Sequence, residues 1–458
     1  YPNDLEARLA FNLLLAETKE FEEFKKALAE YHRLLNRHPD LHWAYPLRLS
    51  ALSSRPFFLP IKLPQVSDQI SVTATDEFTK LALEPSEVNW LRGELILAIE
   101  EGERHFRQLP TKRWNKEAVK AAAKFFVDAT NINFLLTMAK TVEEIAEEYG
   151  EEFLPPNRLV EPLTRYFNDF LRISQIAQRF ADDAEVQWAM IMWGEQMLAS
   201  MLMSSLNSAF EGDRTLSMGE LGKAISAQRN LYKPALERWV WHLRRVIALD
   251  KKQASTALTL LAVHHAFMCD FNSARVAIET GLRQPQPDGP RLAEAIGVLM
   301  NAEAIFTVAN RPSEEQAIMA ALRRRYADWL NRLRTNHPYV PQLTFLWAVM
   351  HLAESSPAKQ VQQEENHRWE WSSVPETVRQ EVLKALKDAA DRNPRSDFAQ
   401  RIFGLTLLLE NKAEQSLLYL RKAHELNPKW FYNRYALALG YLMTGETEKA
   451  LPLFRNDQ

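Results

Sequence analysis

Glycine is scarce in this sequence, with 13 residues among 458. This is under half of the usual share of about 7%. Sheets joined by tight turns and α/β folds with phosphate-binding loops both depend on glycine, so neither class is expected. Ala, Leu, Glu, Lys and Arg are abundant instead, and these residues favour helices. The composition therefore predicts an all-α protein.

Cysteine is almost absent, because Cys269 is the single one. One cysteine excludes an internal disulfide framework and a cysteine-based zinc site. An excess of basic charge is also missing, since the formal net charge is −3 and the pI is near 6.5. We therefore expect no nucleic-acid partner held by a net basic field.

Long apolar runs are missing as well. The longest uncharged run extends from Gln253 to Cys269, which is too short and too polar for a membrane span of about 20 apolar residues. The given residues begin at Tyr1 without an initiator methionine, and their first segment has no signal-peptide pattern. We expect no membrane span in this chain and a cytoplasmic rather than an exported protein, although these residues do not fix the compartment.

Catalytic motifs are absent from the sequence. It contains no Gly-x-Gly-x-x-Gly, no phosphate-loop pattern, no His-Glu-x-x-His and no Gly-x-Ser-x-Gly. Its eleven histidines are scattered, and the adjacent His264 and His265 would point about 100° apart on a helix. The sequence thus predicts no enzyme, no catalytic residue, no cofactor and no metal site.

A regular spacing appears near the end of the chain. Pro394 and Pro428 lie 34 residues apart, each after an asparagine at the expected end of a helix. Asn411 and Gly445, at the same offset, lie where one helix must give way to the next. Apolar residues also recur at this offset, in the pairs Gly404 and Ala438, Phe403 and Leu437, Leu407 and Tyr441, and Leu420 and Phe454. The spacing predicts repeated pairs of helices.

Such a period has a physical cause. Two antiparallel helices joined by a short turn cannot bury their apolar faces alone, so they stack on the next pair. The pattern resembles the tetratricopeptide repeat, most clearly over about residues 394–458, where Ser416 replaces the usual alanine. Weaker copies occur at residues 9–39 and 259–285. The resemblance implies an α-α superhelix.

A further repeat is predicted to be stretched by an insertion. Residues 342–354 and 376–392 fit its two helices, and the polar segment between them carries Trp369 and Trp371. Two exposed tryptophans on such a loop could anchor a partner. The alternative, which we favour, is that they fold back on the solenoid.

The sequence predicts four regions along the chain. Helical hairpins of the repeat type occupy residues 1–52, and a proline-rich extended insertion follows at 53–89, where residues 69–74 alternate as in a short strand. Residues 90–250 form an irregular helical region. Residues 251–458 form a second repeat solenoid with a loop insertion at 355–375.

Details of the irregular region are also predicted. Thr141 and Glu144 fit a capping box that opens a helix after one at residues 116–140. Helices at 218–230 and 234–248 are expected to be separate, with Pro234 starting the second. The segment from Trp188 to Met203 holds five of the twelve methionines. We expect it to be buried core, in preference to a recognition surface or a copper(I) site.

The resemblance implies a function as well as a fold. A superhelix of this family binds a partner protein or peptide along its concave face, which the first helices line. Arg401, Asn433 and Arg434 are expected to be exposed on first helices, where the amide could hold a peptide backbone and the guanidinium groups could pair with acids. We therefore predict a non-catalytic scaffold within a larger assembly.

Two alternatives remain open from the sequence. Twelve tryptophans, among them Trp369 and Trp371, would suit a glycan-binding or secretion-linked envelope protein. The chain could also be the regulatory repeat region of a larger enzyme. The last predicted helix ends soon after Phe454 without a polar capping helix, so we expect a segment of a longer protein rather than ends covered by partner subunits.

Overall fold

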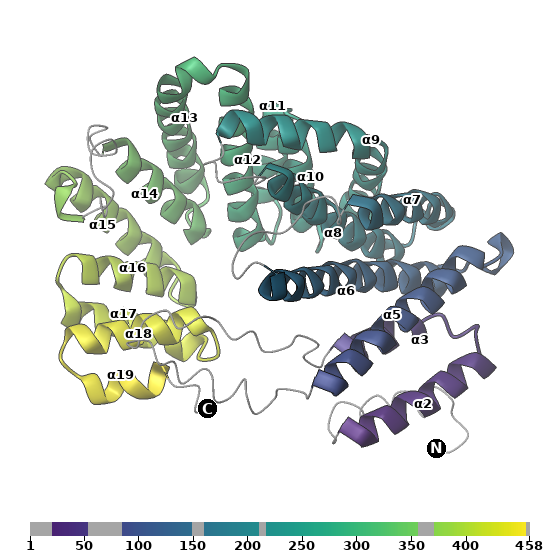
Figure 1. Ribbon diagram of the computed structural model, residues 1–458. Helices are drawn as coiled ribbons and strands as arrows, with labels where there is room; N and C mark the ends of the chain where they lie inside the picture. The colour runs from purple at the N-terminus through teal and green to yellow at the C-terminus, as the bar shows by residue number, and fades with distance from the viewer. Residues whose placement is uncertain (1–20, 54–84, 149–159, 210–216, 356–370, 455–458) are drawn as a thin grey trace. The chain divides into compact units, whose positions relative to one another are not determined.

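The computed structural model describes residues 21–53, 85–148, 160–209, 217–355 and 371–454 (Figure 1). The regular structure of these residues is helical, without a strand, which confirms the predicted all-α class. The strand expected at residues 69–74 and the first half of the repeat expected at 9–39 lie outside the described residues. The chain divides into two compact units, Tyr1–Asp250 (unit 1) and Lys251–Gln458 (unit 2).

Unit 1 is built from long helices that pack in chain order. α5 packs on α3 and α6, α7 packs on α6 and α8, and α8 packs on α9. The described helices of this unit are α2 (Phe21–Arg37), α3 (Ala44–Ser53), α5 (Pro85–Gln108), α6 (Lys116–Glu148), α7 (Val160–Ala177), α8 (Ala184–Ala209) and α9 (Met218–Leu249).

Aromatic rings fill the centre of unit 1. Phe126 of α6 stacks on Trp193 of α8 with ring centroids 4.9 Å apart, and Phe170 of α7 meets the same indole edge-on at 5.4 Å. Trp239 of α9 donates its indole N–H to the Ile191 carbonyl at 3.0 Å. These four aromatic side chains are fully buried, and each buries a large apolar area that stabilises the helix packing.

The methionine-rich segment lies on α8. Met190, Met197 and Met201 are buried, while Met192 is 40% exposed. The helix is apolar on most of its surface because α6, α7 and α9 all pack against it. The prediction that this segment belongs to the core is confirmed.

The helix start predicted at Thr141 is wrong. α6 continues through Thr141 to Glu148, so no helix opens there. A threonine can cap a helix where the amides of the first turn have no helical carbonyl to donate to. Here the residues before Thr141 are already helical, and their carbonyls accept from those amides. A capping box does form at Ser217, whose hydroxyl accepts from the Glu220 amide at 3.3 Å while Glu220 accepts from the Ser217 amide at 3.1 Å.

The break predicted before Pro234 is also wrong, because α9 runs through this proline. An internal proline removes one helix hydrogen bond and costs about 3 kcal/mol. Tyr232, Leu236 and Trp239 are buried on either side of it. Burying three large side chains against the rest of unit 1 offsets this cost.

Unit 2 consists of five successive helical hairpins over its described residues. Their helices are α10 (Ala254–Phe267) with α11 (Phe271–Leu282), α12 (Gly289–Asn310) with α13 (Glu315–Asn336), α14 (Pro341–Ser355) with α15 (Glu376–Arg392), α16 (Asp397–Leu409) with α17 (Ala413–Leu426), and α18 (Phe431–Met443) with α19 (Thr447–Phe454).

The hairpins of unit 2 stack in sequence. Each first helix packs on the next first helix, in the order α10, α12, α14, α16 and α18, and each second helix packs on the first helix that follows it. Figure 1 shows α14, α16 and α18 following one another along the green-to-yellow part of the chain. This regular stacking is the arrangement that the tetratricopeptide resemblance implies, so unit 2 is a TPR-like solenoid.

Three hairpin turns of unit 2 share one geometry. Cys269, Asn411 and Gly445 have positive φ angles of 60°, 58° and 79°. In each turn the next residue donates its amide to the carbonyl five positions earlier, at 2.9 Å for Asp270, 2.9 Å for Lys412 and 2.8 Å for Glu446. This left-handed residue and its hydrogen bonds satisfy the last carbonyls of the first helix. The equivalence of Asn411 and Gly445, read from the spacing, is thus visible in the backbone.

A buried side-chain amide joins successive helices at three places, once in unit 1 and twice in unit 2. Gln187 donates to the Phe180 carbonyl at 2.7 Å, Gln400 to the Ala390 carbonyl at 2.8 Å and Asn433 to the Ala423 carbonyl at 3.1 Å. All three amides are buried in the first turn of a helix (α8, α16 or α18), against the end of the helical segment before it. Each adds a side-chain hydrogen bond to a carbonyl at the end of a helical segment, and the Phe180 and Ala423 carbonyls also accept from the amides of Asp183 and Asn427.

α12 is a helix that its length and composition alone would allow to span a membrane. Half of its most apolar window is buried inside the protein. Its Glu303 is 5% exposed and lies 2.5 Å from both Arg275 and Arg325. A carboxylate held between arginines of the two neighbouring helices, α11 and α13, is typical of a core helix, and we interpret α12 as one.

Candidate functional site

Two of the predicted partner contacts face each other inside unit 2. Arg401 of α16 donates from Nη1 to Oδ1 of Asn433 at 2.7 Å. Nδ2 of Asn433 donates to the carbonyls of Ala423 and Asn427 at 3.1 Å each, and the side chain is fully buried. The prediction that Asn433 is exposed is therefore wrong. Its amide closes the junction between α17 and α18.

The reason for this error is positional. Asn433 lies in the first turn of α18, and the first turn of one hairpin abuts the end of the hairpin before it. Arg401 is half-buried, with its guanidinium 5.8 Å from the Tyr432 ring, and Arg434 is half-buried too. Whether Arg401 and Arg434 contact a partner stays a prediction.

Of the two tryptophans that could anchor a partner, the structure describes Trp371. Trp371 is 7% exposed, and its indole N–H donates to Glu410 at 2.6 Å. Arg379 lies 3.3 Å from the same carboxylate. Trp371 therefore folds back on the solenoid, the alternative that the sequence favoured, and offers no ring for a partner or a sugar. Trp369 lies outside the described residues.

A groove opens in unit 2 among α13, α14 and α15, with a cavity volume of about 480 Å³. Each helix contributes residues spaced three, four or seven positions apart, which lie on one face. The polar and aromatic lining residues are Asp328, Asn331 and Arg334 of α13, Trp347, His351 and Glu354 of α14, and Glu381, Lys384 and Asp388 of α15.

A buried tryptophan is the centre of this groove. Trp347 is 7% exposed, and the Arg334 guanidinium lies 3.9 Å from its ring centroid. The His351 ring lies 4.9 Å from the same indole with an interplanar angle of 18°. Burial lowers the pKa of Arg334 from its usual value, and the Asp388 carboxylate opposes that effect. Arginine stays charged at neutral pH, so its contact with the indole is a cation–π interaction.

One hydrogen-bond contact joins two walls of the groove. Nε2 of His351 on α14 lies 3.0 Å from Oε2 of Glu381 on α15. Arg334, Trp347, His351 and Glu381 thus form a continuous series of side chains from α13 to α15. Such a series holds the groove in one shape before any ligand arrives, which lowers the entropy cost of binding.

Carboxylates dominate the rim. Asp328, Glu354, Glu381 and Asp388 face the groove together with only two residues of fixed positive charge, Arg334 and Lys384. Asp328 and Asp388 are exposed, and neither makes a hydrogen bond or ion pair with another described residue. A cationic side chain that enters the groove would therefore find carboxylates with open acceptor positions.

The groove has the chemistry of a binding site. The buried Trp347, covered by Arg334 and His351, holds the walls of the groove together, and the carboxylates suit the charged end of a lysine or arginine. Across the described part of the chain, no three His, Cys, Asp or Glu side chains converge so as to hold a metal ion. The arrangement can hold a basic segment of a polypeptide.

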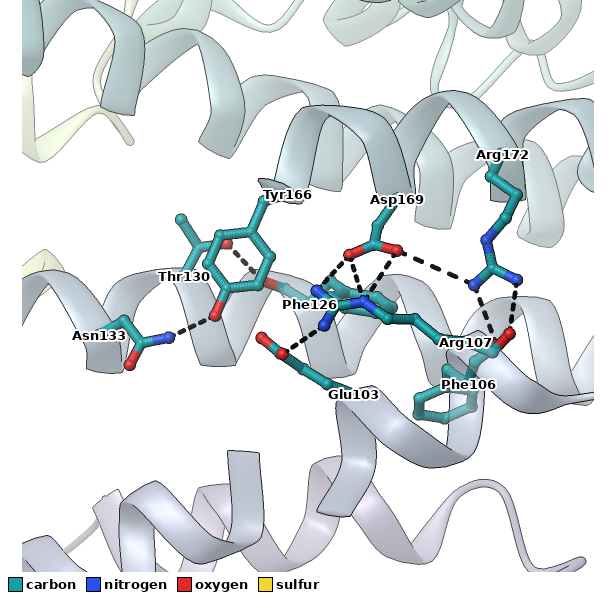
Figure 2. A network of polar contacts seen from close by, with 9 residues as sticks. All are labelled: Glu103, Phe106, Arg107, Phe126, Thr130, Asn133, Tyr166, Asp169 and Arg172. Atoms are coloured by element: carbon teal, nitrogen blue, oxygen red, sulfur yellow. Dashed lines mark hydrogen bonds and ion pairs between the residues drawn. The ribbon is translucent and has the colours of Figure 1, made fainter. Parts of the chain in front are cut away.

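A second polar cluster lies in unit 1, and Figure 2 shows how its side chains are used. Arg107 of α5 makes a bidentate contact with Asp169 of α7, from Nη2 to Oδ2 at 2.7 Å and from Nε to Oδ1 at 3.2 Å, and a contact of 2.6 Å with Glu103. Arg172 donates to the carbonyls of Phe106 and Arg107 at the end of α5, at 3.0 and 3.2 Å.

We interpret this cluster as a set of contacts that stabilises helix packing. Glu103 and Asp169 are 7% and 6% exposed, and Arg107 lies between them (Figure 2). Burial is the main reason that the pKa of Tyr166 is raised, and the Glu103 carboxylate acts in the same direction. The phenol therefore stays neutral, hydrogen bonded to Asn133 of α6. The cluster fixes α5, α6 and α7 together and leaves its carboxylates occupied.

Part of the groove is recognisable from residue spacing. Trp347 and His351 are four residues apart, as are Glu381 and Ala385, so each pair is recognisable as one helix face. Nothing in a single sequence shows that these two faces lie opposite each other, since that depends on how α13 and α15 flank α14.

Unit 2 places the protein in the class of all-α solenoids made of stacked two-helix hairpins. No protein-family model matches the chain, and neither does any curated protein. One solved structure with a similar course is "MamA AMB-1", at 14% identity over 44% of this chain and 89% of that one, with a TM-score of 0.22. Another is yeast Tom70, at 10% identity over 97% of this chain and 90% of that one, with a TM-score of 0.28. Naa15/Naa10 bound to HypK-THB matches at 11% identity over 99% of this chain and 69% of that one, with a TM-score of 0.23. Likenesses this weak carry no conclusion about function.

Proposed function

We propose that this protein is a non-catalytic scaffold whose unit 2 binds a basic segment of a partner protein. The observation that carries the proposal is the groove among α13, α14 and α15. It combines walls that the contacts of the buried Trp347 hold in place with an excess of carboxylates, two of which have no hydrogen-bonding or ion-pairing partner in the described residues. The partner is expected to insert a lysine or arginine there, within a larger assembly.

Electrostatics favour this choice of partner. Four carboxylates within one groove attract a cationic segment and repel an acidic one. The formal net charge of the whole chain, −3, adds a weak attraction in the same direction. The binding is expected to weaken as salt increases, because the rim carboxylates are exposed to solvent.

The proposal is tested by reversing charge at the groove. We expect the double variant Asp328→Lys and Asp388→Lys to bind a fluorescent lysine- and arginine-rich peptide about tenfold more weakly than the natural chain, because two attractions become repulsions. Fluorescence anisotropy at low ionic strength measures the affinity. Both positions are exposed, so the fold should be retained.

A matched control carries the same change of charge elsewhere. Glu425 and Glu448 are exposed acids of unit 2 outside the groove, and their replacement by lysine alters the net charge equally. This control should stay within about twofold of the natural affinity. Equal weakening by both double variants would show that the net charge alone attracts the peptide and would remove the groove from the proposal.

A further inference from the structure

His351 of α14 is the one histidine among the described residues that line the groove. A histidine ordinarily changes its charge between pH 5 and pH 8, whereas carboxylates, lysines and arginines ordinarily keep theirs over that range. The side chain of His351 is 23% exposed, so its imidazole exchanges protons with solvent. The charge of the groove can therefore change at this residue in mildly acid solution.

Two contacts hold the imidazole at a fixed place in the groove. Its ring is stacked on the buried Trp347 indole, with the ring centroids 4.9 Å apart. Its Nε2 lies 3.0 Å from Oε2 of Glu381 on α15. A proton taken up by His351 thus places a positive charge beside a carboxylate that a basic ligand would otherwise use.

Charged groups from all three helices line the groove together with His351. They are Asp328 and Arg334 of α13, Glu354 of α14, and Glu381, Lys384 and Asp388 of α15. The carboxylates attract an added proton, and the two fixed cations repel it. Arg334 does so from the same indole, and Glu354 is shared with Arg324 of α13 at 3.4 Å. Four carboxylates and two fixed cations give the groove a net charge of −2, which protonation of His351 reduces to −1.

We propose that His351 makes the groove sensitive to pH, so that it holds a basic segment at neutral pH and releases it in mildly acid solution. This regulation rests on the function proposed above, because it concerns the same groove and the same ligand. The protonated imidazole weakens binding in two ways. It repels the cationic side chain of the segment, and it occupies the Glu381 carboxylate as an ion pair.

The test compares the affinity for a basic peptide at pH 7.5 and at pH 5.5. The probe is the fluorescent lysine- and arginine-rich peptide, made without histidine or acidic residues so that its own charge stays constant. Fluorescence anisotropy at low ionic strength measures its binding to the full chain and to His351→Gln. Glutamine keeps an N–H donor for Glu381 but takes up no proton in this range.

The expected result is a difference between two ratios. The ratio of the Kd at pH 5.5 to the Kd at pH 7.5 should be about fivefold larger for the natural chain than for His351→Gln, because two unit charges about 4 Å apart in water change a binding constant by about this factor. Comparing ratios removes any change in affinity that the substitution causes equally at both pH values.

His265→Gln is the matched control. His265 of α10 lies 3.8 Å from Asp270, so it is also a histidine beside a carboxylate of unit 2, but it is outside the groove. This variant should keep the ratio of the natural chain within about twofold. Circular dichroism at both pH values checks that each variant is folded. Calorimetry of the natural chain at pH 6, in buffers of different ionisation enthalpy, gives a second readout without a substitution, because peptide binding should release protons.

Failure of this regulation is distinguishable from failure of the proposed function. Equal ratios for the natural chain and His351→Gln, or peptide binding without proton release, would overturn the role of His351 and leave the groove as the binding site. An absence of binding at pH 7.5 would overturn the proposed function, and the regulation with it.

Discussion

At the scale of single residues, His242 is a buried link between three helices of unit 1. Its Nδ1 lies 2.6 Å from Oε1 of Gln187, and its Nε2 lies 2.6 Å from the hydroxyl of Ser174. The side chain is fully buried, and burial lowers the pKa of His242 to about 3. A neutral imidazole satisfies both contacts, because Nδ1–H donates to Gln187 and Nε2 accepts from Ser174. The residue thus depends on remaining uncharged.

This link predicts a loss of stability in acid. The folded pKa of about 3 lies below the unfolded value of 6.5, so the stabilisation is complete above pH 6.5 and declines as the pH falls towards 3. We expect the free energy of unfolding to drop by roughly 2 to 3 kcal/mol more in the natural chain than in His242→Gln between about pH 7 and pH 4.5. Urea denaturation at the two pH values measures this.

Other histidines act as the reference for that measurement. His105, whose pKa burial lowers to about 4, is present in both proteins, so its contribution cancels. The exposed His38 provides a control, since His38→Gln should keep the pH dependence of the natural chain. Parallel pH dependences of the natural chain and His242→Gln would contradict the role given to His242.

At the scale of helices, two glycines show how closely unit 1 is packed. A Cβ atom at Gly194 of α8 would lie 2.1 Å from the Trp239 ring, whereas a Cβ atom at Gly93 of α5 would have no neighbour within 4 Å. The Trp239 indole is held by its hydrogen bond to Ile191, so it has little freedom to move aside. α8 and α9 therefore approach through a position that only glycine fits.

Replacing these two glycines by alanine should have opposite effects. Gly194→Ala is expected to lower the free energy of unfolding by about 1 to 3 kcal/mol through overpacking. Gly93→Ala should raise it by about 0.5 to 1 kcal/mol, because alanine favours the helix and nothing obstructs it. Thermal and urea unfolding of both variants measures the difference. A stabilising Gly194→Ala would mean that the α8–α9 contact is looser than described.

Among the features of the structure, the helices and their turns could be predicted best from the sequence. The left-handed turns at Asn411 and Gly445 follow directly from the 34-residue spacing. The pair α12 and α13 was not recognised, because its helices have 22 residues each and so depart from the repeat length. Pro234 misled the prediction because the packing on both sides of it outweighs its local preference.

The binding surfaces were harder to predict for a related reason. Spacing identifies the residues that share a helix face, but it does not identify what lies opposite that face. Asn433 was expected to meet a partner and instead meets the end of α17. The groove around Trp347 depends on side chains of three helices, one of which is α13, a helix that the sequence did not reveal.

At the scale of unit 2, a local loss of stability is expected to affect only the neighbouring hairpins. Stacked repeats interact with their nearest neighbours, so a local defect should not reach distant ones. Leu420 is fully buried between α16, α17 and α18. We expect Leu420→Ala to cost about 2 to 5 kcal/mol locally, since it leaves a cavity at this contact.

Hydrogen exchange followed by mass spectrometry can locate that defect. Protection of amides should fall in α16 to α19 and remain near its natural level in α10 and α11. Val276, a 63% exposed side chain of α11, provides the control, because Val276→Ala should leave exchange unchanged throughout. A uniform loss of protection across unit 2 in Leu420→Ala would show that the solenoid unfolds as a single cooperative body.

The left-handed turns at Cys269, Asn411 and Gly445 also limit how the chain can change in length. Each joins its two helices through a fixed set of hydrogen bonds, with no spare residue. One inserted residue would rotate the following helix by about 100° if it were added to that helix, and would turn its buried leucines towards water. Insertions and deletions are therefore costly at these points, and the hairpins can vary in size only where they are joined by connections of another kind.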